Sequence, residues 1–141
     1  MPTLKTYDLF ISHAWKYGED YRRVVNFLNS ASNFYYRNYS APEDNPLHID
    51  GKEVRNSNEI ERAITRKIMP VNCVLIISGM YYNNRKWMQF EIDTAKKFNK
   101  PIIAIKPWGA ARMPAEVQNA ADKTVSWNAS SIVDAIRYYS I

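Results

Sequence analysis

Short apolar runs rich in β-branched residues recur along the chain and predict strands that are buried on both faces. The clearest are Cys73–Ile77 and residues 101–105, and residues 7–12 make a third. Two further runs mix aromatic with polar side chains: residues 34–40 are typical of an edge strand, and residues 124–127 of a short last strand. The pattern therefore predicts five strands.

Between these runs, apolar residues recur at the spacing of a helix. Acidic Glu19 and Asp20 favour the start of a first helix that runs to about Ser30. Three more helices are expected to begin at polar residues that can cap a helix. Their expected caps are Asn58 with Glu61 as a capping box, Asn83 or Asn84, and Ser130 or Ser131; their last periodic residues are Ile68, Phe98 and Tyr139, and one turn is expected near Ala115.

One long irregular segment is expected between the second strand and the second helix. Residues 41–56 contain two prolines, a glycine and several charged side chains. Long loops of this kind are usually functional or mobile. We interpret His48 and Asp50 within this segment as solvated loop residues.

Strands that alternate with helices predict a parallel sheet covered by helices on both faces. In such sheets, ligands bind beyond the carboxyl ends of the strands. Three segments follow predicted strands at this edge: Ser12-His13, Tyr39-Ser40 and residues 78–87. The sequence therefore predicts that polar and aromatic side chains converge on one edge of the sheet.

The helix that follows Cys73–Ile77 carries a carboxylate inside an apolar arc. At about 100° per residue, Glu91 falls on the same side as Trp87, Met88, Ile92, Ala95 and Phe98. A carboxylate in such a stripe costs desolvation energy unless something offsets it. Spacing alone leaves two interpretations open. Glu91 either lies at the edge of the stripe and reaches water or a lysine, or it is a buried functional group.

Length and composition predict an ordinary globular protein. With 141 residues, 46% of them hydrophobic and 23% charged, the chain is expected to form a single domain over residues 1–141. The apolar runs are too short to span a membrane, and no signal peptide is recognised. The single cysteine, Cys73, cannot form an internal disulfide and is interpreted as packing in a buried strand. A cytoplasmic protein is expected.

The net charge of +5 does not by itself indicate a nucleic-acid partner. Basic residues occur in scattered pairs such as Arg22-Arg23 and Lys96-Lys97. The chain has no zinc-ligand spacing, no helix-turn-helix pattern and no aromatic RNA-binding motif, so neither nucleic acid nor a metal is expected. Its four glycines are too few and too scattered for a GxGxxG motif or a Walker-type loop. A mild positive field suits an anionic small ligand.

Several segments together resemble a TIR domain, in particular the TIR-like group of bacterial Thoeris antiphage systems. The resemblance rests on the first strand ending in Ser12-His13, the third strand ending in Ser78, and the Trp87-x-x-x-Glu91 helix before the next apolar strand. Residues 38–46 are similar to the second-strand and loop signature of the TIR-like group. The resemblance implies an α/β fold, a flavodoxin-like or TIR-like three-layer sandwich whose five parallel strands have the order 2-1-3-4-5.

The same resemblance implies an activity, because family members with this Glu cleave the nicotinamide–ribose bond of NAD⁺. NAD⁺ is then a substrate, and no cofactor is expected. The implied product is a nucleotide signal in antiphage defence, and the implied partners are a second copy of the chain or a trigger protein, and a downstream effector that senses the product. Carried over by position, Glu91 is the catalytic residue, and the substrate-binding residues are Ser12, His13, Tyr39, Ser40 and Trp87.

Three other classes of protein are alternatives to this enzyme. A non-catalytic TIR-like signalling module would act through protein–protein assembly and would have no need of Trp87 and Glu91, yet both are present. A response-regulator receiver needs an Asp where Ser78 stands, and a flavodoxin needs a phosphate loop rich in Ser, Thr and Gly after the first strand, where this chain has Ser12-His13-Ala14-Trp15.

Overall fold

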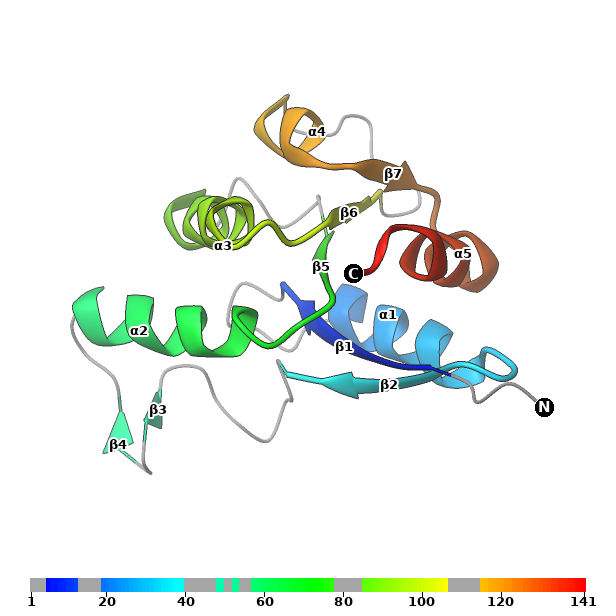
Figure 1. Cartoon of the computed structure of the whole chain (residues 1–141), viewed down its shortest axis with the longest axis horizontal. Helices are drawn as coiled ribbons and strands as arrows, with labels where there is room; N and C mark the ends of the chain where they lie inside the picture. Colours follow the sequence, from blue (N-terminus) through cyan, green and yellow to red (C-terminus); the bar gives the residue numbers. More distant parts are fainter. Residues whose placement is uncertain are drawn as a thin grey trace.

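A five-stranded parallel sheet forms the centre of the computed structural model, which describes residues 5–12, 19–39, 48–49, 52–53, 57–77, 85–106 and 115–141 (Figure 1). All neighbouring strands pair in parallel. The strand order β2-β1-β5-β6-β7, counted within this sheet, is 2-1-3-4-5 and confirms the predicted flavodoxin-like fold. The strands are β1 (Thr6–Ile11), β2 (Tyr35–Asn38), β5 (Cys73–Ile77), β6 (Ile102–Ile105) and β7 (Lys123–Val125).

Helices cover both faces of this sheet, which gives the molecule three layers (Figure 1). One face packs against α1 (Glu19–Ser30) and α5 (Ala129–Tyr139). The other face packs against α2 (Ser57–Ile68), α3 (Arg85–Lys97) and α4 (Ala115–Ala120). The sheet therefore separates two apolar cores.

The middle strands show why the sequence forms this arrangement. Every residue of β5 and β6 is buried, as expected for strands with helices on both sides. Because successive side chains point to opposite faces, Leu75 joins the core under α1 and α5, whereas Val74 and Ile76 join the core under α2 and α3. The edge strands β2 and β7 expose more of their side chains, which matches their more polar sequences.

Two helix starts differ from the sequence-based expectation. Helix α2 begins at Ser57, so the predicted cap Asn58 lies inside the helix. Helix α5 is capped by Asn128, whose Oδ1 accepts hydrogen bonds from the Ser131 backbone N–H at 2.8 Å and the Ser130 hydroxyl at 3.1 Å. Asn caps a helix as well as Ser does. The cap is therefore Asn128, and the predicted caps Ser130 and Ser131 lie in the first turn of the helix. The proposed caps Asn83 and Asn84 lie outside the described residues.

The end of α3 also differs from the prediction. The helix ends at Lys97, and Phe98, expected on its buried arc, follows the helix and is only partly buried. Asn99 takes a left-handed conformation with φ 57°, and the Lys100 N–H donates to the Ala95 carbonyl at 2.8 Å. This arrangement closes the last turn, because the left-handed residue lets the next N–H reach back to a free carbonyl.

A second, two-stranded sheet lies within the segment expected to be irregular. Strands β3 (His48–Ile49) and β4 (Lys52–Glu53) pair antiparallel. The expectation of a loop at His48 is therefore wrong for its backbone, and Asp50 lies outside the described residues. The signal in the sequence is Asp50-Gly51 between the two strands, a pair that favours a tight hairpin connection.

None of the described helices combines the length and the apolar character needed to cross a bilayer.

Candidate active site

The end of β1 places Ser12 on the α2 and α3 side of the sheet. Leu9 and Ile11 belong to the core under α1 and α5, whereas Phe10 belongs to the core under α2 and α3. Strand alternation therefore directs the next side chain, Ser12, toward α3. Its backbone N–H donates to the Leu75 carbonyl at 2.8 Å, which extends the pairing of β1 with β5, and the residue is fully buried.

Helix α3 places Glu91 in the same core. Met88 and Ala95, three residues before and four residues after Glu91, are buried against the sheet, and so is the next residue, Ile92. Glu91 itself is only 2% exposed. The carboxyl is therefore buried and does not lie at a solvent-exposed helix edge, which rules out the first of the two interpretations that spacing left open.

Ser12 and Glu91 meet at the carboxyl end of β1. The Ser12 hydroxyl donates to Glu91 Oε1 across 3.4 Å, a long hydrogen bond for two oxygen atoms. The other carboxyl oxygen, Oε2, is buried and has no hydrogen-bond partner among the described residues. A buried oxygen without a partner costs free energy, and structures that keep one usually use it.

Burial also sets the ionisation of this group. Desolvation raises the pKa of Glu91 to about 8 from an ordinary 4.5, and the Ser12 hydrogen bond acts in the opposite direction. At neutral pH, Glu91 in the unliganded protein is therefore mostly the neutral acid. A carboxyl with a pKa near working pH is typical of catalytic sites.

Tyr39 follows β2 on the same side of the sheet. Its backbone N–H donates to the Leu9 carbonyl at 2.9 Å, and its ring is partly buried against the core under α2 and α3. The carbonyl of Tyr39 accepts a hydrogen bond from Lys67 Nζ of α2 at 3.2 Å. Tyr39 therefore belongs to the face of the sheet that carries Ser12 and Glu91.

The remaining predicted site residues are described only in part. Trp87 lies in the first turn of α3, one helical turn before Glu91, and its side chain is outside the described residues. His13 and Ser40 also lie outside the described residues. Among the predicted residues, the structure thus brings Ser12 and Glu91 into contact, and it places Tyr39 on their side of the sheet.

The contact between Ser12 and Glu91 was not predicted, although both residues were. The sequence did contain a signal for this contact. Strand alternation places Phe10 and Ser12 on the same face of the sheet, and the apolar stripe of a covering helix packs on that face. The hydrogen bond from Lys67 to the Tyr39 carbonyl left no comparable signal, because it joins a helix to a turn far away in sequence.

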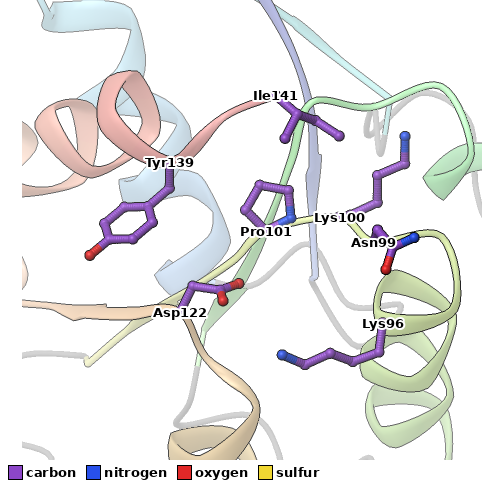
Figure 2. Close-up of a pocket in the computed structure, with 7 residues that line it drawn as sticks. All are labelled: Lys96, Asn99, Lys100, Pro101, Asp122, Tyr139 and Ile141. Carbon is purple, nitrogen blue, oxygen red and sulfur yellow. The ribbon is translucent and has the colours of Figure 1, made fainter.

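A pocket of about 340 Å³ lies at the opposite, amino-terminal edge of the sheet (Figure 2). Its Asp122 is already engaged, because Oδ2 accepts a hydrogen bond from the Ile102 N–H at 2.8 Å. Its charges are also mixed, with Lys96 and Lys100 beside that carboxylate. The lining residues are Lys96, Asn99, Lys100, Pro101, Asp122, Tyr139 and Ile141.

No group of three or more potential metal ligands occurs in the parts of the chain that the structure describes.

The fold and the buried carboxyl together define a flavodoxin-like α/β protein with a polar site at the carboxyl edge of its sheet. The sequence model of the family described as Thoeris protein ThsB, TIR-like domain, matches residues 10–112, and the chain belongs to this family. The matched region contains Ser12, Tyr39, Trp87 and Glu91. Family membership assigns the chain a TIR-type role in antiphage defence. No curated protein matches the chain.

Proposed function

We propose that the protein is an enzyme that cleaves the nicotinamide–ribose bond of NAD⁺ and produces an ADP-ribose-derived nucleotide signal. The observation that carries this proposal is the carboxyl of Glu91. It is 2% exposed, and Oε2 has no partner among the described residues. A buried acceptor of this kind suits donor groups of a ligand, such as the hydroxyls of a ribose.

One carboxylate is enough for this reaction. In the cleavage step, the bond between ribose C1′ and the pyridinium nitrogen breaks, and its electron pair leaves with nicotinamide. The leaving group becomes neutral, so it needs no proton from a second acid, unlike the alkoxide of an ordinary glycoside. An acceptor then forms a bond to C1′ of the oxocarbenium-like ribose and loses a proton. Glu91 stabilises the positive charge that develops on that ribose.

The ionisation of Glu91 fits a cationic substrate. The unliganded site favours the neutral acid, because burial raises the pKa of Glu91 to about 8. A positive charge close to the carboxyl lowers its pKa again and favours the carboxylate. The nicotinamide end of NAD⁺ carries such a charge, so substrate binding itself promotes the catalytically competent form of Glu91.

The other predicted residues complete the proposed site. The aromatic rings of Trp87 and Tyr39 are suited to stack on nicotinamide or adenine. His13 and Ser40 are proposed to contact the ribose or the phosphates. A second copy of the chain or a trigger protein is proposed to activate the enzyme, and a downstream effector to sense the product.

The test is mass-resolved NAD⁺ turnover by the purified protein at high concentration, with and without a crowding agent and a phage-infected lysate. Glu91→Gln keeps the size of the side chain but cannot ionise, and it is expected to lose nicotinamide release. Asp93→Asn is the matched control, because Asp93 lies on the same helix but is exposed and accepts a hydrogen bond from Gln89 at 2.9 Å. This control is expected to retain wild-type turnover.

The co-product identifies the acceptor by its mass, since water, an internal nucleophile and an added small molecule give different products. Equal turnover by wild type and Glu91→Gln would exclude Glu91 as the catalytic residue. A wild-type protein that leaves NAD⁺ intact under all these conditions would contradict the proposed activity. The non-catalytic signalling module would then be the better description.

A further inference from the structure

The two oxygens of the Glu91 carboxyl have different surroundings. Oε1 faces the Ser12 hydroxyl at 3.4 Å, whereas Oε2 is buried without a partner among the described residues. Ser12 is itself fully buried, and its backbone is fixed by the hydrogen bond to the Leu75 carbonyl. The hydroxyl therefore reaches Glu91 from a rigid strand end.

We propose that Ser12 is a positioning residue that holds Oε1 of Glu91 and stabilises the carboxylate, leaving Oε2 for a ribose hydroxyl of the substrate. The assignment of Oε2 rests on the proposed NAD⁺ cleavage, whereas the contact between Ser12 and Glu91 does not. Ser12 acts through Glu91 in this scheme, rather than on the reacting atoms.

The length of the contact supports this role. A hydroxyl approaches an ionised carboxylate to about 2.5–2.7 Å and a neutral oxygen to about 2.7–2.8 Å, so a separation of 3.4 Å leaves room for the bond to shorten. Hydrogen bonds in catalytic sites are often long without substrate and shorten in the complex. We infer that the Ser12 hydrogen bond shortens when Glu91 ionises, which makes its contribution largest in the form that reacts.

Ser12 has no described competitor for this role, because the charged residues of the surrounding elements are engaged or lie elsewhere. On α3, Asp93, Lys96 and Lys97 are exposed. On α2, Glu61, Arg62 and Arg66 line an outer groove with Phe90, and Lys67 donates to the Tyr39 carbonyl. Strands β5 and β6 present only apolar side chains to this core, Asp8 of β1 pairs with Arg37, and Glu116 of α4 is partly exposed.

The first test follows the ionisation of Glu91 without any substrate. Protein labelled with ¹³C at the Glu carboxyl carbon is titrated by NMR, and the Glu91 signal is assigned by its absence in Glu91→Gln. Ser12→Ala is expected to shift the midpoint upward by roughly half to one pH unit, since a donor to the carboxylate is lost. Ser12→Thr keeps the hydroxyl and is expected to stay near wild type.

Two further variants keep this test decisive. Thr94→Val removes a buried hydroxyl from the same helix, but that hydroxyl donates to the Phe90 carbonyl at 2.8 Å, so the Glu91 midpoint is expected to stay unchanged. Ser12→Cys replaces Ser12→Ala if the latter does not fold, because the thiol has a similar size and is a weaker donor. An unchanged Glu91 midpoint in folded Ser12→Ala, or in Ser12→Cys where that variant replaces it, would overturn the proposal.

The second test uses the pH profile of kcat/KM for NAD⁺, which reports ionisation of the free enzyme. Ser12→Ala is expected to shift the acidic limb upward and to lose about three- to tenfold at neutral pH, with most of the loss recovered at alkaline pH. A uniform loss at every pH would indicate a merely structural role and would contradict the proposal. If wild type does not consume NAD⁺ at all, the assignment of Oε2 fails with the proposed function, while the NMR midpoints still decide the role of Ser12.

Discussion

The two edges of the parallel sheet differ in how well their polar groups are hydrogen-bonded. At the amino-terminal edge, Asn72 and Asp8 exchange two hydrogen bonds: the Asn72 N–H donates to the Asp8 carbonyl at 2.6 Å, and the Asp8 N–H donates to Asn72 Oδ1 at 2.8 Å. Asp122 and Ile102 exchange a similar pair, both at 2.8 Å. At the carboxyl edge, Glu91 has one long contact and one oxygen without a described partner.

The difference supports the proposal that the carboxyl edge binds a ligand, whereas the amino-terminal edge stabilises the fold. Side chains at the starts of the strands satisfy backbone groups that would otherwise be unpaired, which stabilises the fold. Glu91 instead retains an unsatisfied group in the core, which costs stability. Proteins keep such costs mainly where a ligand or a reaction uses the group.

The two edges also each hold a buried ionisable group. Burial raises the pKa of Cys73, at the amino-terminal edge, to about 12. Its thiol is thus neutral at any ordinary pH, although the nearby Ser140 hydroxyl, which forms no regular hydrogen bond, acts to lower the pKa. Burial raises the pKa of Glu91 to about 8, which is close to neutral pH. Burial therefore makes Cys73 inert, while it makes Glu91 responsive to pH and to ligand charge.

The largest expected effect on stability concerns Glu91 and its dependence on pH. The folded state keeps a proton that the unfolded state loses above pH 4.5, so wild-type stability falls as pH rises from there to about 8 and levels off beyond. The slope due to this group is about 1.4 kcal/mol per pH unit. Glu91→Gln lacks this slope. Its free energy of unfolding relative to wild type is therefore expected to rise by roughly 3 to 5 kcal/mol as the pH increases from about 5 to about 8.

Urea denaturation of both proteins at several pH values measures this difference, and Asp93→Asn serves as the control for removing an exposed carboxylate from the same helix. The comparison uses the difference between variant and wild type, because other groups titrate equally in both. Parallel stability curves for wild type and Glu91→Gln would show that Glu91 is not buried as a neutral acid. The contrast between the two edges would then fail.

A moderate effect is expected at the amino-terminal edge. Asn72→Ala removes the acceptor of the Asp8 N–H and the donor to the Ile141 carbonyl oxygen at 2.8 Å. Leaving such partly buried groups unpaired costs about 1–3 kcal/mol. We expect thermal and urea unfolding to show this loss at every pH, with the NAD⁺ turnover of the folded fraction unchanged, because the site lies at the other edge.

Asn29→Ala is the matched control, because Asn29 is exposed and its side chain accepts a hydrogen bond from the hydroxyl of another side chain, Tyr36, rather than from the backbone. Its expected change is within about 0.5 kcal/mol. If Asn72→Ala and Asn29→Ala cost the same, the reciprocal pairing at the amino-terminal edge does not stabilise the fold as inferred.

The sheet was predictable because its signals are local. The runs around Leu75 and Ile103 are apolar throughout, as buried parallel strands require, and α1 has the bounds that its acidic start and apolar spacing indicated. The cap of α5 was missed because Asn128 and the two serines after it are equally good candidates, and only packing chooses among them. The hairpin within residues 41–56 was missed because its strands are two residues long.

The candidate site was predictable only in part. Trp87 and Glu91 are recognisable from their spacing and from the family resemblance, and Ser12 from its place after a strand. Whether Glu91 is buried, and which group faces it, depends on how α3 packs on β1, two elements that lie far apart in sequence. Helical periodicity gives the direction of a side chain but not its depth in the core, so the raised pKa of Glu91 emerged only from the structure.

The smallest expected effect lies on the exposed side of Asp8. Arg37 forms a two-point ion pair with Asp8, with contacts of 2.6 and 3.1 Å, but its side chain is 66% exposed. Solvent and side-chain entropy leave little net stabilisation in such a pair. Arg37→Ala is therefore expected to lower the midpoint of thermal unfolding less than Asn72→Ala does, and high salt should remove the difference from wild type, because screening weakens exposed pairs. A loss as large as that of Asn72→Ala, or one that persists in high salt, would mean that the ion pair supports the edge as much as the buried hydrogen bonds do.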